Sequence, residues 1–404
     1  NSYNADIGDI DGAMTRDTMS SSSKYQPEPV WQPNSQLAGQ SHMHRFMQAA
    51  GAAHGRVFAD WQQLYEWSLA EPAAFWTMVA DYTGVRFSRQ AEKVLVDGDR
   101  MPGARWFVGS KLNYAENLLA ASGNPQPLIF RDERGRRTAL RRDELSERVA
   151  GVAAGLRAAG LQPGDRVAAI LPNCPEAVIA MLAAASIGAV FSSCAPEFGA
   201  QAIVDRFAQI EPRILFVCDG YCYGGKTFKV LPKAAEVSAR ITSIQAVVVV
   251  PFLEDEPAVS PAASMLLFED FMRPNSAPDF EQLPFDHPLF VLYSSGTTGK
   301  PKCIVHSAGG TLVQHLKELV LHTNLSSSDR IFYYTNCGWM MWNWLVSALA
   351  TDAQVMLYDG SPFYPEPDSL WRVVAEEQVT VFGTSPGFLV ASEKAGVKPN
   401  TLGV

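Results

Sequence analysis

A short segment rich in glycine, hydroxyl and lysine residues carries the clearest chemistry in this sequence. Residues 294–302 read Ser-Ser-Gly-Thr-Thr-Gly-Lys-Pro-Lys and follow an apolar run. Glycine lets backbone N–H groups approach an anion closely, hydroxyl groups donate to phosphate oxygens, and lysines add positive charge. The segment, here called the phosphate loop, therefore predicts a polyphosphate site. Its candidate nucleotide-binding residues are Ser294, Ser295, Gly296, Thr297, Thr298, Gly299, Lys300 and Lys302.

Two familiar phosphate-binding motifs do not account for this loop. A Walker A loop has four residues between its glycines and a Ser or Thr after its lysine. Here two residues separate Gly296 from Gly299, and Pro301 follows Lys300. The dinucleotide-binding pattern G-x-G-x-x-G is absent from the sequence. The other interpretation of the segment is an ordinary Gly/Ser/Thr surface turn.

The composition is that of a globular protein with more than one structural unit. The 404 residues are 47% hydrophobic and 19% charged, with a mean hydropathy of −0.03, which excludes wholesale disorder and a small disulfide-bonded scaffold. A net charge of −9 argues against nucleic acid as a partner. The six cysteines form no zinc-like cluster, so no metal site is predicted, and scattered thiols favour a cytoplasmic protein.

Neither the start of the chain nor its longest apolar run predicts a membrane segment. Residues 1–30 are polar and lack the apolar core of a signal peptide. The apolar run over residues 177–191 is about five residues short of the ~20 needed to cross a bilayer. We therefore predict no membrane insertion.

Strand and helix patterns alternate from residue 140 onward. Apolar runs over residues 166–171, 214–218 and 246–250 predict buried strands, and helical periodicity appears between such runs. Parallel strands require crossover connections. This order therefore predicts an α/β fold with parallel-rich sheets flanked by helices.

The phosphate loop and several flanking segments resemble one enzyme superfamily. The loop looks like the phosphate-binding signature of the adenylate-forming enzymes, which include acyl-CoA synthetases, luciferases and peptide-synthetase adenylation domains. Residues 101–107 and 112–117 resemble the acetyl-CoA synthetase branch. Residues 301–310, 338–344 and 357–362 are similar to the acetoacetyl-CoA synthetases in particular.

The resemblance implies an acid–thiol ligase that uses ATP, Mg²⁺ and coenzyme A. In such enzymes a carboxylate attacks the α-phosphate of ATP to give an acyl-adenylate and pyrophosphate, and the thiol of coenzyme A then displaces AMP. Acetoacetate is the acid that the resemblance favours, with acetate or propionate as the alternative. The family's adenylation lysine lies beyond Val404, so the catalytic residues stay unknown, and a catalytically incomplete fragment is the other interpretation.

The same resemblance implies roles for four further residues. Trp339, Met340 and Met341 match the acyl-pocket segment, in which acetate-activating relatives carry threonine at the position of Met341. Methionine is adaptable, which favours a different, larger acid, whereas core packing is the alternative for Met340. Lys226 matches one of two arginines that contact coenzyme A phosphates, and Tyr223 replaces the other. A solvated surface lysine is the alternative for Lys226.

These patterns divide the chain into five parts, and the resemblance begins at about residue 31. The expected fold is that of an adenylate-forming N-terminal domain, incomplete at its C-terminus, whose oligomeric state the sequence does not indicate. The parts are a disordered tail (1–30), an acyl-CoA synthetase-type region (31–139), a first α/β subdomain (140–250), a Pro-rich connection (251–288) and a second, truncated α/β subdomain with the phosphate loop (289–404).

Overall fold

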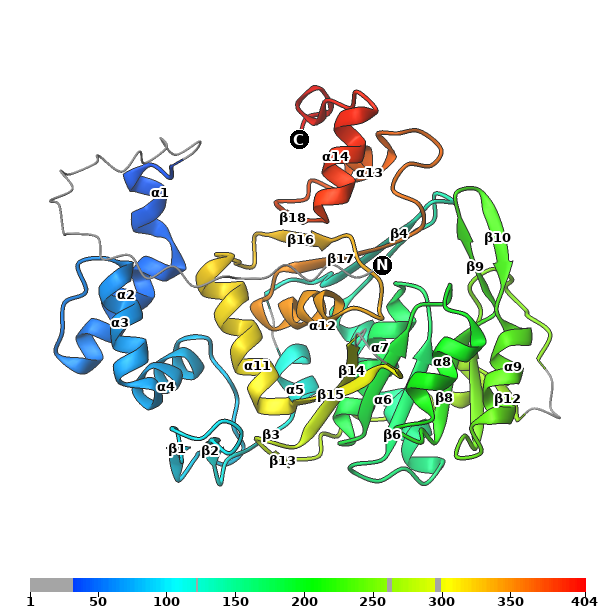
Figure 1. Cartoon of the computed structure of the whole chain (residues 1–404), viewed down its shortest axis with the longest axis horizontal. Helices are drawn as coiled ribbons and strands as arrows, with labels where there is room; N and C mark the ends of the chain where they lie inside the picture. The colour runs from blue at the N-terminus through cyan, green and yellow to red at the C-terminus, as the bar shows by residue number, and fades with distance from the viewer. Residues whose placement is uncertain (1–31, 121–122, 260–263, 295–298) are drawn as a thin grey trace, which may run out of the picture. The chain divides into compact units, whose positions relative to one another are not determined.

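A computed structural model describes residues 32–120, 123–259, 264–294 and 299–404. The chain has two compact units, residues 1–40 and residues 41–404. Helix α1 (Ser35–Gln40) belongs to the first unit, and every other element belongs to the second (Figure 1). The tail predicted over residues 1–30 lies outside the described residues.

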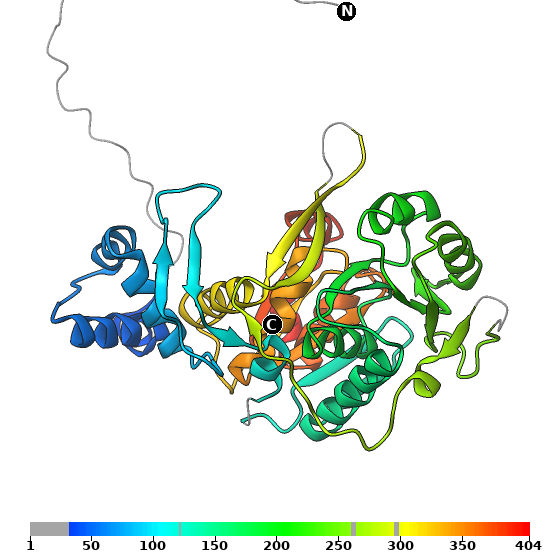
Figure 2. The ribbon, with the colours of Figure 1, turned by 90° about the horizontal axis from the view of Figure 1, so that it is seen from below.

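The larger sheet of the second unit has seven strands in the order β12–β11–β8–β6–β7–β14–β15. Neighbouring strands are parallel except for β14 and β15, which form an antiparallel hairpin at the sheet edge (Figure 2). Apolar runs suit the central strands because both faces of such a sheet are covered. The bounds are β6 (Arg166–Ile170), β7 (Val190–Cys194), β8 (Ile214–Cys218), β11 (Ala246–Val250), β12 (Met265–Leu267), β14 (Pro288–Ser294) and β15 (Lys302–Ser307).

The smaller sheet has five strands in the order β18–β16–β17–β4–β5. Only the β4–β5 pair is antiparallel among these described strands. The sheet therefore combines strands from near residue 130 with strands that follow the phosphate loop. The bounds are β4 (Leu128–Asp132), β5 (Arg137–Leu140), β16 (Arg330–Tyr333), β17 (Gln354–Asp359) and β18 (Val381–Gly383).

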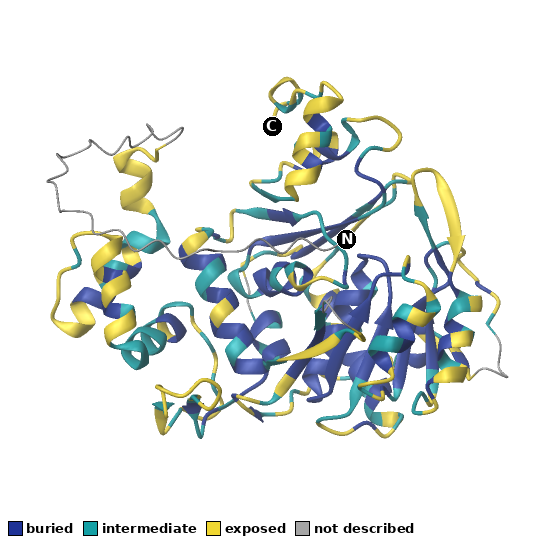
Figure 3. Cartoon of the chain, viewed as in Figure 1, coloured by how far each residue is buried: buried dark blue, intermediate teal, exposed yellow. Residues whose placement is uncertain are grey.

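Helix α7 (Pro175–Ser186) lies at the centre of the core. Every residue of α7 except Glu176 is buried, and the helix contacts β7 of the larger sheet and β4 of the smaller one. A helix that is apolar on all sides is stable only when protein surrounds it. Figure 3 shows the buried residues gathered in the two sheets and the helices packed on them.

Further helices cover the sheets or form the N-terminal part of the second unit. Within residues 41–120 three helices precede the small hairpin of β1 and β2. Two more strand pairs complete the fold, β3 with β13 and β9 with β10. The bounds are α2 (His42–His54), α3 (Trp61–Ala70), α4 (Pro72–Tyr82), β1 (Lys93–Val96), β2 (Arg105–Val108), β3 (Lys111–Leu112), α5 (Tyr114–Leu119), α6 (Arg142–Ala158), α8 (Ala200–Phe207), β9 (Gly220–Tyr223), β10 (Lys226–Lys229), α9 (Leu231–Arg240), α10 (Phe268–Phe271), β13 (Leu283–Pro284), α11 (Ala308–Leu316), α12 (Met340–Ser347), α13 (Ser369–Glu376) and α14 (Pro386–Lys394).

The predicted α/β fold with parallel-rich sheets is confirmed. Strands β8 and β11 have the predicted bounds, and β6 ends one residue earlier than predicted. The stretch predicted as a Pro-rich connection, residues 251–288, contains the edge strand β12, the short helix α10 and the two-residue strand β13. Among the described residues, no helix is both long enough and apolar enough to span a bilayer.

Candidate active-site cleft

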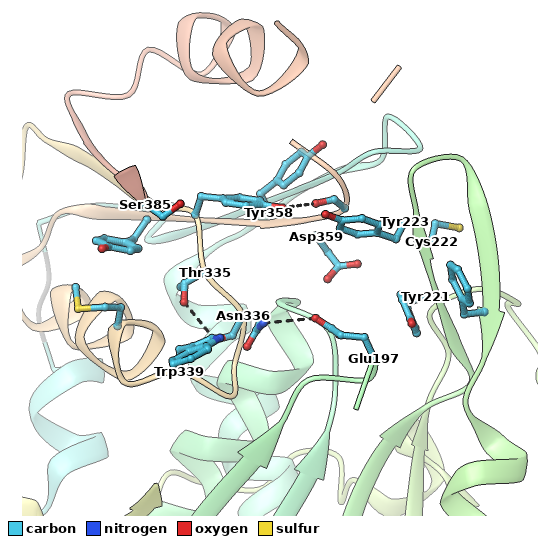
Figure 4. A pocket seen from close by; sticks show the side chains of 15 residues that line it. Glu197, Tyr221, Cys222, Tyr223, Thr335, Asn336, Trp339, Tyr358, Asp359 and Ser385 are labelled. Carbon is cyan, nitrogen blue, oxygen red and sulfur yellow. Dashed lines mark hydrogen bonds between the residues drawn. The ribbon is translucent and has the colours of Figure 1, made fainter. Parts of the chain in front are cut away.

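A cleft opens where strands of both sheets end. Its volume is ≈ 650 Å³, which is ample for a small organic substrate. Glu197 follows β7, Asn336 follows β16 and Asp359 ends β17, while the β9–β10 hairpin forms one side (Figure 4). Ligands of parallel α/β sheets bind outside the carboxyl ends of the strands. The cleft therefore has the position of an active site.

Asp359 is the carboxylate at the centre of this cleft and points into it between Tyr223 and Glu197 (Figure 4). Its Oδ1 accepts the backbone N–H of Asn173, in the loop after β6, at 3.3 Å. Burial raises the pKa of Asp359 to about 7; the Asn173 N–H opposes this shift and the charge of Glu197 adds to it. Asp359 can therefore hold or release a proton near neutral pH.

The raised pKa of Asp359 predicts that the folded protein loses stability as the pH rises toward neutral. The unfolded chain releases this proton near 3.8, whereas the folded protein keeps it until about 7. Between these values the free energy of unfolding falls by up to about 1.4 kcal/mol per pH unit. Asp359→Asn keeps an acceptor for Asn173 but cannot ionise, so it should lose this part of the pH dependence. Urea unfolding of both proteins between about pH 5 and pH 8 measures it, and parallel pH profiles would contradict the prediction.

Aromatic side chains form other walls of the cleft. Tyr221 and Phe228, on the two strands of the hairpin, stack with their ring centroids 5.0 Å apart. The hydroxyl of Tyr334 donates to the carbonyl of Gly360 at 2.9 Å, and burial raises the pKa of Tyr334. Because that hydroxyl already has a backbone partner, the ring of Tyr334 offers the cleft mainly apolar surface.

The ends of the phosphate loop lie at the carboxyl edge of the larger sheet. Ser294 ends β14 and is paired with Lys302, which begins β15. Because β14 runs parallel to β7, both strands end at the same edge. Gly299 has a φ of +88°, and exposed Lys300 and Lys302 form no ion pair with another described residue. The remaining candidates Ser295, Gly296, Thr297 and Thr298 lie outside the described residues.

The candidate acyl-pocket residues lie at the start of α12, and two of them face the cleft. Trp339 and Met341 line the cavity. Met340 is 44% exposed and is not among the described residues that line it. Trp342 is fully buried, and its Nε1 donates to Asn173 Oδ1 at 2.9 Å. This hydrogen bond attaches α12 to the loop after β6, beside Asp359.

Lys226 begins β10 in the hairpin and is exposed. Its partner across the hairpin is Tyr223, which lines the cleft, whereas Lys226 is not among the described lining residues. The lysine therefore lies near the rim of the cleft. In the described part of the chain it takes part in no ion pair, so its charge is available to an anionic ligand.

Sequence reasoning did not single out Glu197, Asn336 or Asp359. Each lies at or just beyond the carboxyl end of a strand, and each brings a polar side chain into the cleft. Their position at the carboxyl ends of strands is the signal that could have identified them as candidate site residues. The structure also contains six free cysteines, and its described ranges hold no group of three or more His, Cys, Asp or Glu side chains suited to a metal ion.

Fold and cleft together define an enzyme of the AMP-binding class. A family model described as "AMP-binding enzyme" matches residues 120–400. A second model, "Acetyl-coenzyme A synthetase N-terminus", matches residues 61–118. The chain belongs to the AMP-binding enzyme family.

Its relatives narrow the comparison to one kind of ligase. The acetoacetyl-coenzyme A synthetase of Rhizobium meliloti (strain 1021) is 47% identical over 374 residues, which are 92% of this chain and 57% of that protein. The Gallus gallus acetoacetyl-CoA synthetase is 44% identical, with the same two coverages. A solved structure, "Acetoacetyl-CoA Synthetase from Streptomyces lividans", matches with a TM-score of 0.89 and 46% identity over 93% of this chain and 58% of that one. The resemblance to acetoacetyl-CoA synthetases is thus confirmed, and this chain spans little more than half the length of these relatives.

Proposed function

We propose that the whole protein joins acetoacetate to coenzyme A with cleavage of ATP to AMP and pyrophosphate. The observation that carries the proposal is the phosphate loop, whose two lysines pair with no described residue and lie at the sheet edge that also forms the cleft. The names of the relatives support the choice of acid. The acid's carboxylate would attack the α-phosphate, and the thiol would then attack the acyl carbon and release AMP.

The phosphate loop is proposed to hold the β- and γ-phosphates. Attack of one anion on another is slow unless positive charge and N–H donors neutralise the phosphates. Lys300 and Lys302 supply charge, and Gly299 allows close backbone approach. The carbonyl of Pro301 accepts a hydrogen bond from Nε2 of Gln209 at 2.9 Å. This bond connects the end of the loop to the segment after α8.

The acid is proposed to lie against Trp339 and Met341, and the nature of residue 341 should affect acid choice. Met341→Thr replaces a long apolar side chain by a short one and should shift the ratio of kcat/KM values among acetoacetate, acetate and propionate by about tenfold or more, the range for one or two methylene groups in a pocket. Met340→Thr is the matched control, since Met340 does not line the cleft in the described structure. Equal shifts in both variants would contradict a pocket role for Met341.

Coenzyme A is proposed to bind at the β9–β10 hairpin, where Lys226 offers a positive charge beside the aromatic side chains of the cleft. Under the proposed function the nucleotide is the magnesium complex of ATP. The described residues offer no ready cluster of protein ligands for that ion.

Acetoacetate-dependent exchange between ATP and pyrophosphate tests the proposal, in the protein made from its complete reading frame. Exchange with acetoacetate and formation of acetoacetyl-CoA are expected. Exchange that responds only to acetate or propionate would contradict the assigned acid. The 404-residue chain alone, which spans 57% of its relative from Rhizobium meliloti, should form little thioester.

We also propose a cytoplasmic location. Its support is that all six cysteines are free, as expected where thiols are kept reduced. Measuring the free thiols of the protein purified under non-reducing conditions tests this point, because disulfides in freshly isolated protein would contradict it.

A further inference from the structure

Glu133 binds two segments that flank the cleft. It lies in the turn between β4 and β5 of the smaller sheet. One of its carboxylate oxygens accepts the backbone N–H groups of Gly224 at 2.9 Å and Ser361 at 2.8 Å, and the other accepts that of Gly225 at 2.9 Å. Gly224 and Gly225 form the turn of the β9–β10 hairpin, and Ser361 lies two residues after Asp359. One side chain thus joins the hairpin tip to the strand end that carries the central carboxylate.

This contact fixes the part of the hairpin that is farthest from the sheet. The hairpin is a separate two-stranded sheet (Figure 1), and β10 is exposed along its length. At its base, the carboxylate of Asp219 accepts three backbone N–H groups from residues 252–254 at 2.8–2.9 Å. At its tip, Gly225 has a φ of +75°, and an added Cβ would lie 2.7 Å from the ring of Tyr364. The hydrogen bonds to Glu133 are charge-assisted and so stronger than neutral ones.

The hairpin and the phosphate loop follow different strands of the larger sheet. The hairpin follows β8 and the loop follows β14, and the strand order β8–β6–β7–β14 separates them by three strand spacings, or about 14 Å. Lys226 is exposed, and the rings of Tyr223 and Phe228, which line the cleft, are 50% and 40% exposed. A cation beside accessible rings suits a ligand that carries both phosphate and an aromatic base.

We infer that Glu133 is a positioning residue for the thiol-dependent half-reaction, because it holds the hairpin at which coenzyme A is proposed to bind. The inference rests on the proposed function, under which ATP occupies the phosphate loop and coenzyme A the hairpin. Glu133 affects the binding of coenzyme A indirectly, through the position of the hairpin turn. Formation of the acyl-adenylate does not involve coenzyme A, so it should be much less sensitive to the position of the hairpin.

Glu133→Gln in the complete protein tests the inference. A glutamine has one carbonyl oxygen for three N–H donors, and its own NH₂ group faces a donor, so the hairpin tip should loosen. The KM for coenzyme A is expected to rise about tenfold, while acetoacetate-dependent pyrophosphate exchange stays within about twofold of wild type. Hydrogen exchange of the Gly224 and Gly225 amides should accelerate in the same variant.

Glu254→Gln is the matched control. It removes a different carboxylate that contacts the same hairpin, because Glu254, which follows β11, pairs with Lys229 of β10, and it leaves the Glu133 contacts in place. This control should change neither half-reaction. If Glu133→Gln lowers pyrophosphate exchange as much as thioester formation, or accelerates amide exchange without changing the KM for coenzyme A, the positioning role is refuted.

A second variant keeps the test decisive if Glu133→Gln does not fold. Gly225→Ala forces the turn away from Tyr364 without altering Glu133, and the same rise in the KM for coenzyme A with unchanged pyrophosphate exchange is expected. Equal loss of both half-reactions would overturn the inference. Wild-type protein is measured first, because the absence of exchange with any acid would overturn the proposed function and not merely the role of Glu133.

Discussion

The double variant Lys300→Ala, Lys302→Ala is expected to lower kcat/KM for ATP by at least about a hundredfold. Each lysine can give one charge-assisted hydrogen bond to a phosphate oxygen, worth about 1.5–3 kcal/mol, and about 1.4 kcal/mol corresponds to a factor of ten. Both side chains are exposed and neither is paired with a described residue. Their removal should therefore leave the packing and the stability of the fold unchanged. Steady-state kinetics with ATP as the varied substrate measures the effect.

Two controls distinguish phosphate binding by Lys300 and Lys302 from a general effect of removing positive charge. Lys93→Ala removes an exposed lysine from β1, away from the loop, and should leave kcat/KM for ATP unchanged. The double variant should also keep the thermal midpoint of wild type. A kcat/KM for ATP within about threefold of wild type, less than one such hydrogen bond is worth, would remove the basis for nucleotide binding at residues 294–302.

Local patterns in the sequence were sufficient for several strands, and they also gave the hypothesis of a phosphate loop. Strands β8 and β11 are short, continuous apolar runs, and such runs indicate a strand that is buried on both faces. The phosphate loop could be proposed because its glycines, hydroxyl groups and lysines are adjacent in the chain, and its binding of phosphate stays a prediction. In both cases the relevant physical property belongs to one short segment.

The assembly of the sheets could not be predicted from such patterns. Strand β4 pairs with β17, and β14 lies beside β7, although long segments separate the members of each pair. Consecutive strands are spatial neighbours only about two-thirds of the time. Which strands pair depends on how helices such as α7 pack between the sheets. The periodicity of apolar residues in the sequence contains no information on that packing.

The carboxylates of the cleft were missed for the same reason. Glu197 and Asp359 come from different sheets and meet only because β7 and β17 end at one cleft. In the sequence each is a single acidic residue after a strand, which by itself is common. The raised pKa of Asp359 depends on burial and on the charge of Glu197, and both depend on the assembled fold.

A single carboxylate holds three strands of the smaller sheet together on its outer side. Glu377, just after α13, is 3% exposed. It accepts hydrogen bonds from Arg131 of β4 at 2.8 Å, from Arg137 of β5 at 2.8 and 3.0 Å, and from Arg330 of β16 at 3.4 Å. Removing one member of a buried ionic cluster leaves the others without a counter-charge, which is more costly than losing an exposed ion pair.

Glu377→Ala is therefore expected to lower the free energy of unfolding by about 3–5 kcal/mol. Its neighbour gives the control, because the Glu376 side chain is 56% exposed and, among the described residues, pairs only with Arg131, so Glu376→Ala should cost less than about 1 kcal/mol. Urea unfolding near neutral pH measures both, and similar losses in the two variants would contradict the role of the cluster.

The pH dependence of this difference gives an independent check with a defined sign. Burial raises the pKa of Glu377, but the hydrogen bonds and charges of Arg137 and Arg131 outweigh it, so its pKa lies below the usual value. A carboxylate with a lowered pKa in the folded state stabilises the protein above the pKa of the unfolded chain and loses that effect as the pH falls. The gap between wild type and Glu377→Ala should thus be largest near neutral pH and shrink below about pH 4. A gap of constant size would mean that lost packing, and not the ionic cluster, causes the instability.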